Sequence, residues 1–196
     1  MHKTAILILA AGSSSRLGRP KQLLSYSGKT LICNIVDAAI AAELSPVIVI
    51  TGSSAEEVSL ELAEKNVEIV FNDNWPDGMG SGIVTGIKKL LQLSPDTAEV
   101  IIAVCDQPFV TSDFLSNLVA LKNKSKKTIV SSSYAETFGT PVLFDKKHFE
   151  ALLSLKGNEG AKKLLGLLKD EMISLPFKKG SWDIDTEADY TKLIND

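Results

Sequence analysis

The sequence predicts a three-layer α/β protein, with a mostly parallel central sheet and helices on both of its faces. Short apolar runs rich in β-branched residues alternate with longer segments of helical periodicity, which is typical of a parallel sheet covered by helices. No internal repeat or low-complexity linker divides the 196 residues. We therefore expect one domain over residues 1–196, an ordinary length for a single domain.

Seven apolar segments are predicted to be strands, and the last two have the weaker patterns: 4–9, 46–51, 67–71, 100–104, 128–132, 141–144 and 172–176. Helical periodicity predicts helices between and after them at 30–42, 56–65, 81–91, 112–121, 146–153 and 160–168, with a short one after 187. Residues 53–54 and Ser112 are predicted to cap the helices that follow them. Ligands of such sheets bind outside the carboxyl ends of the strands, so the loops after Leu9, Phe71 and Val104 should hold the site.

The composition excludes some classes of protein. The formal net charge is −3, from 21 Lys and Arg against 24 Asp and Glu, which argues against a nucleic-acid binder. The first apolar run is too short to span a bilayer, so no membrane association is expected. Cys33 and Cys105 are far apart in the sequence. We expect reduced thiols and a cytoplasmic location.

The loop after the first strand has the residues of a phosphate-binding turn. It runs from Leu9-Ala10-Ala11-Gly12 through Ser14, Arg16 and Gly18 to Pro20-Lys21. Small residues let the backbone approach an anion closely, and its N–H groups can converge on phosphate oxygens. Arg16 adds a forked donor and Lys21 a point charge. A plain surface turn is the alternative reading of the Gly/Ser content alone.

Two common phosphate motifs are absent. Gly28-Lys29-Thr30 would end a P-loop, but Leu23 stands where the first glycine is required. The dinucleotide fingerprint fails because Ser14 occupies the position of its second glycine.

The first loop instead resembles the signature of the NTP-transferase superfamily. Within it, the chain resembles the molybdenum cofactor cytidylyltransferases, relatives of MocA and more distantly of MobA, through separated motifs along nearly the whole chain. The resemblance implies a Rossmann-like nucleotidyltransferase fold. It also implies nucleotide contacts from the first loop and from a second segment, through Leu9, Ala10, Ala11, Gly12, Ser14, Arg16, Lys21, Gly78, Met79, Gly80 and Ser81.

Two carboxylates are candidate Mg²⁺ ligands. Asp106 follows the fourth predicted strand within Cys105-Asp106-Gln107-Pro108, and a carboxylate leaving a parallel strand points into the ligand crevice. The resemblance supports this role. Asp185 precedes Thr186 and an acidic helix, so helix capping and metal binding are both open for it; the resemblance favours a second metal contact.

The acceptor site is implied by resemblance alone. Gly139 and Pro141 belong to a segment that resembles the acceptor-lining strand of the family. Asn158 stands in Gly157-Asn158-Glu159-Gly160-Ala161 where the family usually has Asp, which removes a charge. A hydrolytic triad has little support, because His2 is terminal and His148 is expected on a surface helix.

The predicted function is transfer of CMP from CTP to a molybdopterin-type cofactor with release of pyrophosphate. Arg16, Lys21 and Asp106 are the catalytic candidates and Mg²⁺ is the expected cofactor. Ala11 and the loop Gly78-Met79-Gly80-Ser81-Gly82 resemble the cytidylyl branch. The alternatives are guanylyl transfer, transfer to a sugar or polyol phosphate, and a non-catalytic maturation partner of a molybdoenzyme. A molybdoenzyme is also a candidate partner of the enzyme itself.

Overall fold

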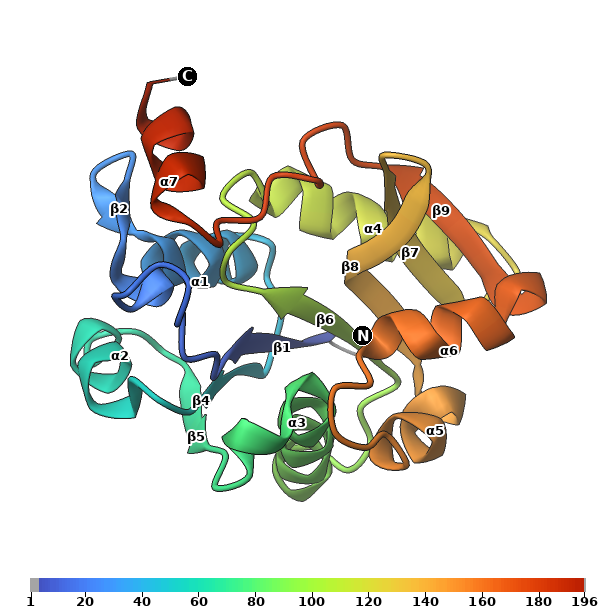
Figure 1. Cartoon of the computed structure of the whole chain (residues 1–196). Helices are drawn as coiled ribbons and strands as arrows, with labels where there is room; N and C mark the ends of the chain where they lie inside the picture. The colour runs from blue at the N-terminus through green and yellow to red at the C-terminus, as the bar shows by residue number, and fades with distance from the viewer. Residues whose placement is uncertain (1–3, 196) are drawn as a thin grey trace.

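A seven-stranded sheet forms the centre of the computed structural model, which describes residues 4–195 (Figure 1). One strand, β8 (Thr137–Asp145), pairs antiparallel with both of its neighbours, and the remaining pairs in this sheet are parallel. Across the sheet the strands lie in the order β5 (Glu68–Phe71), β4 (Val47–Thr51), β1 (Ala5–Ala10), β6 (Glu99–Val104), β8 (Thr137–Asp145), β7 (Ile129–Tyr134) and β9 (Met172–Pro176).

Helices cover both faces of this sheet, so the predicted three-layer architecture is confirmed (Figure 1). One face is covered by α1 (Leu31–Ala41), α2 (Ala55–Glu61) and α4 (Ser112–Lys124). The other is covered by α3 (Met79–Leu93), α5 (Phe149–Leu153) and α6 (Ala161–Leu167).

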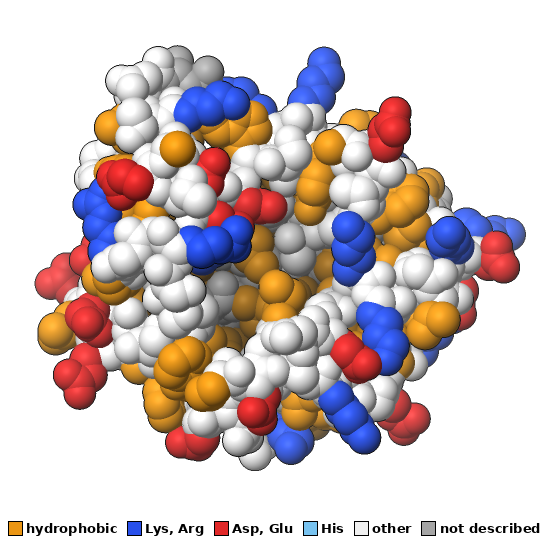
Figure 2. All heavy atoms as spheres, in the orientation of Figure 1, with side chains coloured by type: hydrophobic (Ala, Val, Ile, Leu, Met, Phe, Trp, Pro, Cys, Tyr) orange, Lys and Arg blue, Asp and Glu red, His pale blue; other side chains and the backbone are white. Residues whose placement is uncertain are grey.

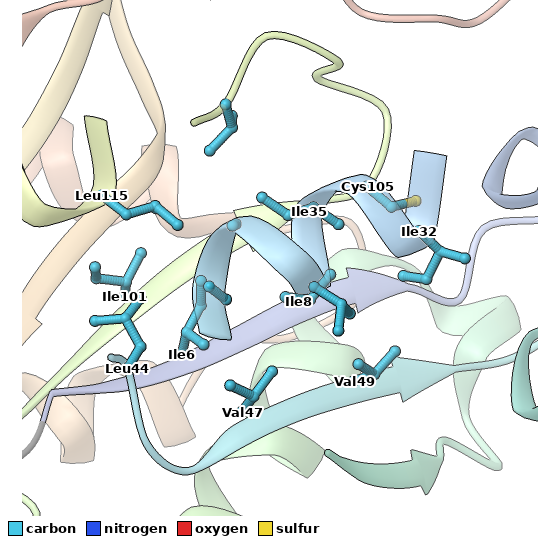
Figure 3. Close-up of a cluster of buried hydrophobic side chains, with 14 of the residues drawn as sticks. Ile6, Ile8, Ile32, Ile35, Leu44, Val47, Val49, Ile101, Cys105 and Leu115 are labelled. Atoms are coloured by element: carbon cyan, nitrogen blue, oxygen red, sulfur yellow. The ribbon is translucent and has the colours of Figure 1, made fainter. Parts of the chain in front are cut away.

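The alternation of side chains along β1 shows why its sequence is apolar throughout. Ile6 and Ile8 belong to the core under α1 and α4, whereas Ala5 and Leu7 belong to the core under α3. Figure 3 shows the first of these cores, where Ile6 and Ile8 lie close to α1. A strand buried on both faces has no solvent-facing side for polar residues, which is the pattern of a central parallel strand.

All seven predicted strands are present, with some shifts at their ends. The segment at 141–144, whose strand pattern was weak, is the end of a longer strand that begins at Thr137 and is antiparallel to both of its neighbours. A small hairpin was not predicted. It pairs β2 (Ser25–Tyr26) with β3 (Lys29–Thr30) around Ser27 and Gly28, both of which have positive φ.

Two details of the predicted helices are wrong. The N-cap of α4 is Thr111 rather than Ser112, because the Thr111 hydroxyl accepts from the Phe114 N–H at 3.2 Å. The helix α2 ends at Glu61 rather than at residue 65, although Ser54 does occupy its N-cap position as predicted, without a side-chain hydrogen bond.

The C-terminal helix α7 (Glu187–Ile194) packs against the hairpin and the first loop. The Tyr190 hydroxyl donates to the Ser25 carbonyl at 2.9 Å, and Arg19 pairs with Glu187 at 2.7 Å. A small apolar cluster fills the space between them: Leu17, Leu24, Leu31, Ile184 and Leu193. The last segment of the chain therefore lies beside the first loop.

Both cysteines are buried free thiols, as expected. Within residues 4–195, none of the helices is both long and apolar enough to cross a bilayer.

His148 is buried, with 5% of its surface exposed, so its predicted place on a helix surface is wrong. Its Nε2 lies 2.9 Å from the Thr128 hydroxyl, which itself donates to Glu171 at 2.9 Å. Because that hydroxyl has only one proton, His148 Nε2 is the donor to Thr128. Burial lowers the pKa of His148 below its ordinary value of 6.5, and Lys147 lowers it further against the opposing charges of Glu171 and Asp145.

The lowered pKa predicts a loss of stability in mild acid. As pH falls below about 6.5, the unfolded chain takes up the His148 proton before the folded chain does, so the free energy of unfolding should fall. His148→Gln should be less stable than the parent at pH 8 by about 1–2 kcal/mol, through lost packing. It should also lose less stability between pH 7.5 and 5. Urea unfolding over this range measures both, and equal pH slopes for the two proteins would contradict the prediction.

Candidate active site

A cavity of about 330 Å³ opens at the carboxyl ends of the central strands. It lies among the three loops expected from the sequence, those that follow β1, β5 and β6. Figure 2 shows this face hollowed near its centre, with basic and acidic side chains beside the hollow. The cavity is lined by Leu9, Ala10, Ala11, Gly12, Lys21, Gln22, Trp75, Gly78, Met79, Gly82, Val104, Cys105, Asp106 and Asn158.

The first loop is closed by contacts from its own far end. The Ser14 carbonyl accepts from the N–H groups of Leu17 and Gly18, both at 3.0 Å. The Ser14 hydroxyl accepts from the Lys21 N–H at 3.1 Å. Gln22 is fully buried, and its amide nitrogen donates to the carbonyls of Ala10 and Gly12. The segment 10–22 is therefore a fixed turn around the cavity edge.

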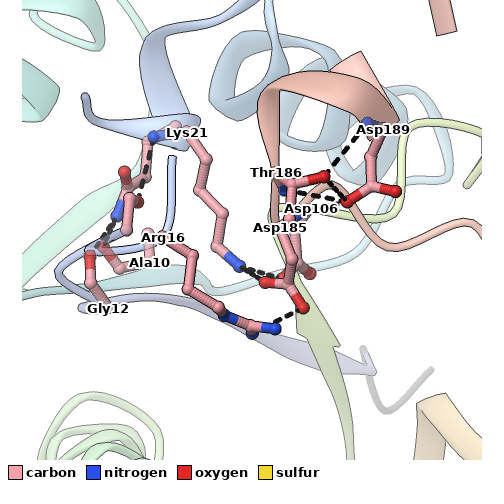
Figure 4. A network of polar contacts seen from close by, with 10 residues as sticks. Ala10, Gly12, Arg16, Lys21, Asp106, Asp185, Thr186 and Asp189 are labelled. Carbon is pink, nitrogen blue, oxygen red and sulfur yellow. Dashed lines mark hydrogen bonds and ion pairs between the residues drawn. The ribbon is translucent and has the colours of Figure 1, made fainter. Parts of the chain in front are cut away.

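Lys21 joins the two carboxylates that the sequence singled out (Figure 4). Its Nζ lies 2.5 Å from Asp106 Oδ2 and 3.0 Å from Asp185 Oδ1. Arg16 reaches the other oxygen of Asp185 at 2.8 Å. The structure thus brings together two cations from the first loop and two carboxylates from distant parts of the chain.

The pKa values of this network follow from its charges. Burial alone would lower the pKa of Lys21, but the charge and hydrogen bond of Asp106 outweigh it and raise the pKa well above 10.5. Burial would raise the pKa of Asp185, but Lys21 and Arg16 outweigh it, and the pKa lies below its usual 3.8. Lys21 and Asp185 are therefore both ionised near neutral pH.

Asp183 behaves differently from Asp185. Desolvation and then the negative charges of Asp106 and Asp185 raise its pKa to about 6. Cys105, beside Asp106, has a pKa raised to about 12, chiefly by burial. The Cys105 thiol is therefore neutral at physiological pH.

Asp106 has an acceptor atom left over. Its Oδ1 is buried and has no hydrogen-bond partner, while Oδ2 pairs with Lys21. Carboxylate oxygens are the ligands that Mg²⁺ prefers, and this ion is usually held by one or two carboxylates together with substrate phosphates. Asp106 and Asp185 fit that pattern. Among residues 4–195, no group of three or more His, Cys, Asp or Glu side chains could hold a metal without such help.

The opposite wall of the cavity is a tight contact between two glycine-rich segments. Gly78 has φ 108° and ψ −172°, at the start of α3, a conformation that is essentially restricted to glycine. A Cβ there would lie 2.1 Å from Asn158 Oδ1. The Gly80 N–H donates to the Gly157 carbonyl at 2.9 Å. The candidate acceptor segment around Asn158 therefore lies directly on the candidate nucleotide segment.

Several predicted residues lie away from the cavity lining. The Ser81 hydroxyl bonds to Asn72, Asn74 and Gly78. Pro141 is buried in β8, and its carbonyl accepts from Ser132. The remaining predicted contacts that do not line the cavity are Ser14, Arg16, Gly80, Gly139 and Asp185. Ligand contacts at these positions stay predictions.

Two cavity residues were missed or left open by the sequence. Gln22 follows Pro20-Lys21 directly, but neither its burial nor its contacts with backbone carbonyls can be read from the sequence. Trp75, which the sequence did not assign to the site, also borders the cavity. A larger hollow of about 1330 Å³ lies near the amino ends of β1 and β4 and contains none of the predicted site residues.

The model of the MobA-like NTP transferase domain family matches residues 6–172. The chain belongs to this family. It is a nucleotidyltransferase, which agrees with the glycine- and serine-rich turn and the carboxylates beside the cavity. The matched region includes the first loop, Asp106 and Asn158, whereas Asp185 lies beyond it.

Named relatives cover most of the chain. The purine catabolism protein PucB of Bacillus subtilis is 30% identical, over 94% of this chain and 92% of its own. A probable molybdenum cofactor guanylyltransferase of Bacillus anthracis is 29% identical, over 89% of this chain and 78% of its own.

Solved structures have the same fold. Rv0371c of Mycobacterium tuberculosis superposes with a TM-score of 0.83 and 26% identity, over 99% of both chains. A complex of that protein with manganese has a TM-score of 0.80 at 25% identity, over 98% of both chains.

The contact at Gly78 predicts a large cost for adding one methyl group. Gly78→Ala should lower the free energy of unfolding by about 1–3 kcal/mol from backbone strain alone, with a further cost from the collision with Asn158. Asn158→Ala in the same chain should recover the part due to the Asn158 side chain, but not the parts due to φ or to the Gly157 carbonyl oxygen, which would lie 2.9 Å from the new Cβ. Chemical denaturation of the single and double variants separates the side-chain contribution from the rest.

Gly166→Ala is the matched control. Gly166 lies in α6 with open space around its Cβ position, so alanine should be neutral or stabilise by up to about 1 kcal/mol. Equal losses at Gly166 and Gly78 would show that the contact with Asn158 has no special role.

Proposed function

We propose that this nucleotidyltransferase transfers CMP from CTP to the terminal phosphate of a molybdopterin-type cofactor. The observation that carries the proposal is the network of Lys21, Arg16, Asp106 and Asp185 at the edge of the cavity. It brings two cations and two carboxylates together beside the first loop, which supports a site for phosphate and a divalent metal. The named guanylyltransferase relative supports the acceptor class.

In the proposed reaction, an oxygen of the acceptor phosphate attacks the α-phosphorus of the nucleotide. A new phosphorus–oxygen bond forms as the bond to the bridging oxygen breaks, and pyrophosphate leaves with the electron pair. A phosphate monoester is already a competent nucleophile at neutral pH, so no general base is required. The chain contributes positioning through the first loop and charge stabilisation through Arg16 and Lys21.

Asp106 and Asp185 would hold Mg²⁺, which when bound supplies positive charge to the phosphates. The buried, unpartnered Oδ1 of Asp106 supports this assignment, and so does the manganese complex of the similar protein. Lys21, freed from Asp106, could then pair with a phosphate oxygen.

Cytosine is favoured over guanine by the side chains around the cavity. Guanine presents adjacent N–H donors that a carboxylate would match. Among the residues described as lining the cavity, Asp106 is the only carboxylate, and it belongs to the phosphate end. Trp75 offers an aromatic surface for stacking. The names of relatives favour GTP instead, so guanylyl transfer is the second candidate.

The first test measures pyrophosphate released by the purified protein with molybdopterin-type acceptor, Mg²⁺ and each of the four nucleoside triphosphates. CTP should give the highest kcat/KM because its base fits a cavity without a second carboxylate. A higher value with GTP would replace cytidylyl by guanylyl transfer. Nucleotide binding without pyrophosphate release would instead favour a non-catalytic partner of a molybdoenzyme.

Loss of the carboxylate at Asp106 should sharply reduce turnover. Asp106→Asn should lower kcat/KM at least about 100-fold, the usual scale for losing one electrostatic stabiliser. Asp96→Asn is a control with the same chemical change on an exposed turn before β6, and it should keep full activity. Retention of Mg²⁺-dependent turnover by the Asp106 variant would refute the metal assignment.

A further inference from the structure

The side-chain amide of Gln22 is buried, and its nitrogen and oxygen differ in their hydrogen bonding. Its side chain is 0% exposed. The amide nitrogen donates to the Ala10 carbonyl at 2.7 Å and to the Gly12 carbonyl at 3.0 Å. Its oxygen, Oε1, is buried and has no hydrogen-bond partner. The amide orientation is fixed by this environment, because the reverse orientation would place an acceptor against two carbonyl oxygens.

An orphaned buried carbonyl is a cost that an apolar residue of similar size would avoid. A leucine or methionine would fill the same space without leaving Oε1 unpaired. The contribution that only glutamine makes here is the pair of N–H bonds to Ala10 and Gly12. These two hydrogen bonds therefore account for a glutamine at this position despite its unpaired Oε1.

The two bonds fix the direction of the loop's own N–H groups. Each peptide unit is planar and trans, so its C=O and the following N–H point in opposite directions. Because the carbonyls of Ala10 and Gly12 point toward Gln22, the N–H groups of Ala11 and Ser13 point away from it. Ala11 and Gly12 line the cavity, and converging backbone N–H groups are a recognised anion site.

We infer that Gln22 is the positioning residue of the phosphate turn, holding its peptide planes so that backbone N–H groups are preset for the pyrophosphate part of the nucleotide. This inference rests on the proposed function and extends it to a residue that touches the loop rather than the reacting atoms. Gly12 has a second anchor, the Ser53 hydroxyl, which donates to the same carbonyl at 3.0 Å. Lys21, the neighbour of Gln22, is held in the turn through its own N–H to Ser14.

The test uses pyrophosphate with Mg²⁺ as the probe, titrated calorimetrically into the full-length protein. Gln22→Met keeps the volume and removes both N–H bonds, and it should weaken pyrophosphate binding about 10-fold, or 1.4 kcal/mol. Cytidine, which has no phosphate, should bind the variant and the parent alike. A merely structural loss at Gln22 would weaken both ligands together.

The matched control is Asn34→Leu. Asn34 also donates a side-chain amide to a backbone carbonyl, that of Tyr26 at 2.9 Å, but it lies outside the cavity lining. This variant should keep the parent's affinity for pyrophosphate. An equal loss in both variants would overturn the inference.

Ser53→Ala provides a second variant that removes an exposed hydroxyl and should fold even if the Gln22 variant does not. It should weaken pyrophosphate binding by a smaller factor, about three-fold, because Gln22 still holds Gly12. The double variant should deviate from the product of the two single effects, since both residues act on one carbonyl. Parent-like pyrophosphate affinity in both single variants overturns the inference, whereas a parent protein that does not bind pyrophosphate overturns the proposed function with it.

Discussion

The ion pairs of Lys21 are the constraint on which the site depends. Its Nζ joins Asp106, 85 residues away, and Asp185, 164 residues away. The first loop, the end of β6 and the C-terminal segment therefore meet at one ammonium group that is largely screened from water, with 14% of its side chain exposed. Removing one partner from such a group leaves the others poorly compensated, which is usually far more costly than the net value of the pair. Lys21 is therefore a largely enclosed ion-pair partner rather than a solvent-exposed surface charge.

The order of the strands in the sheet brings two of these three segments together. β1 and β6 are neighbours in parallel, with Leu9 opposite Val104, so the loops that follow them begin side by side. The third participant needs a different support, because residues 182–186 belong to no strand. α7 supplies it through a capping box, in which Asp189 accepts from the Thr186 backbone and hydroxyl while Thr186 caps Asp189. Of the two roles that the sequence left open for Asp185, helix capping is performed by Thr186, whereas Asp185 pairs with Lys21 and Arg16 and its metal binding stays a prediction.

The sequence was informative where one local signal sufficed. Continuous β-branched runs located the buried strands, and glycine, serine and basic residues after the first run located the turn around the cavity. It could not show that β8 runs antiparallel, because a strand's direction is set by its partners rather than by its own composition. His148 was misplaced because its neighbours Lys146 and Lys147 suggest a solvated helix, whereas Thr128 and Glu171, which enclose it, come from distant segments. Gln22 was missed for a different reason: its amide donates to backbone carbonyls of its own loop, and because every residue has a carbonyl, no sequence pattern reveals such a contact.

The net charge of the four side chains at the site explains why, under the proposed function, the nucleotide and a divalent metal should bind together. Arg16 and Lys21 are matched by Asp106 and Asp185, so the four groups sum to zero and present no excess positive charge to a triphosphate. A nucleotide arriving alone would gain the cations only by separating them from carboxylates that would then face its own negative charge. With Asp106 and Asp185 holding a divalent cation, Lys21 and Arg16 would be available to the phosphates, and the cation would supply positive charge in the same place. The turn held by Gln22 then contributes neutral donors, whose orientation does not change when the charges exchange partners.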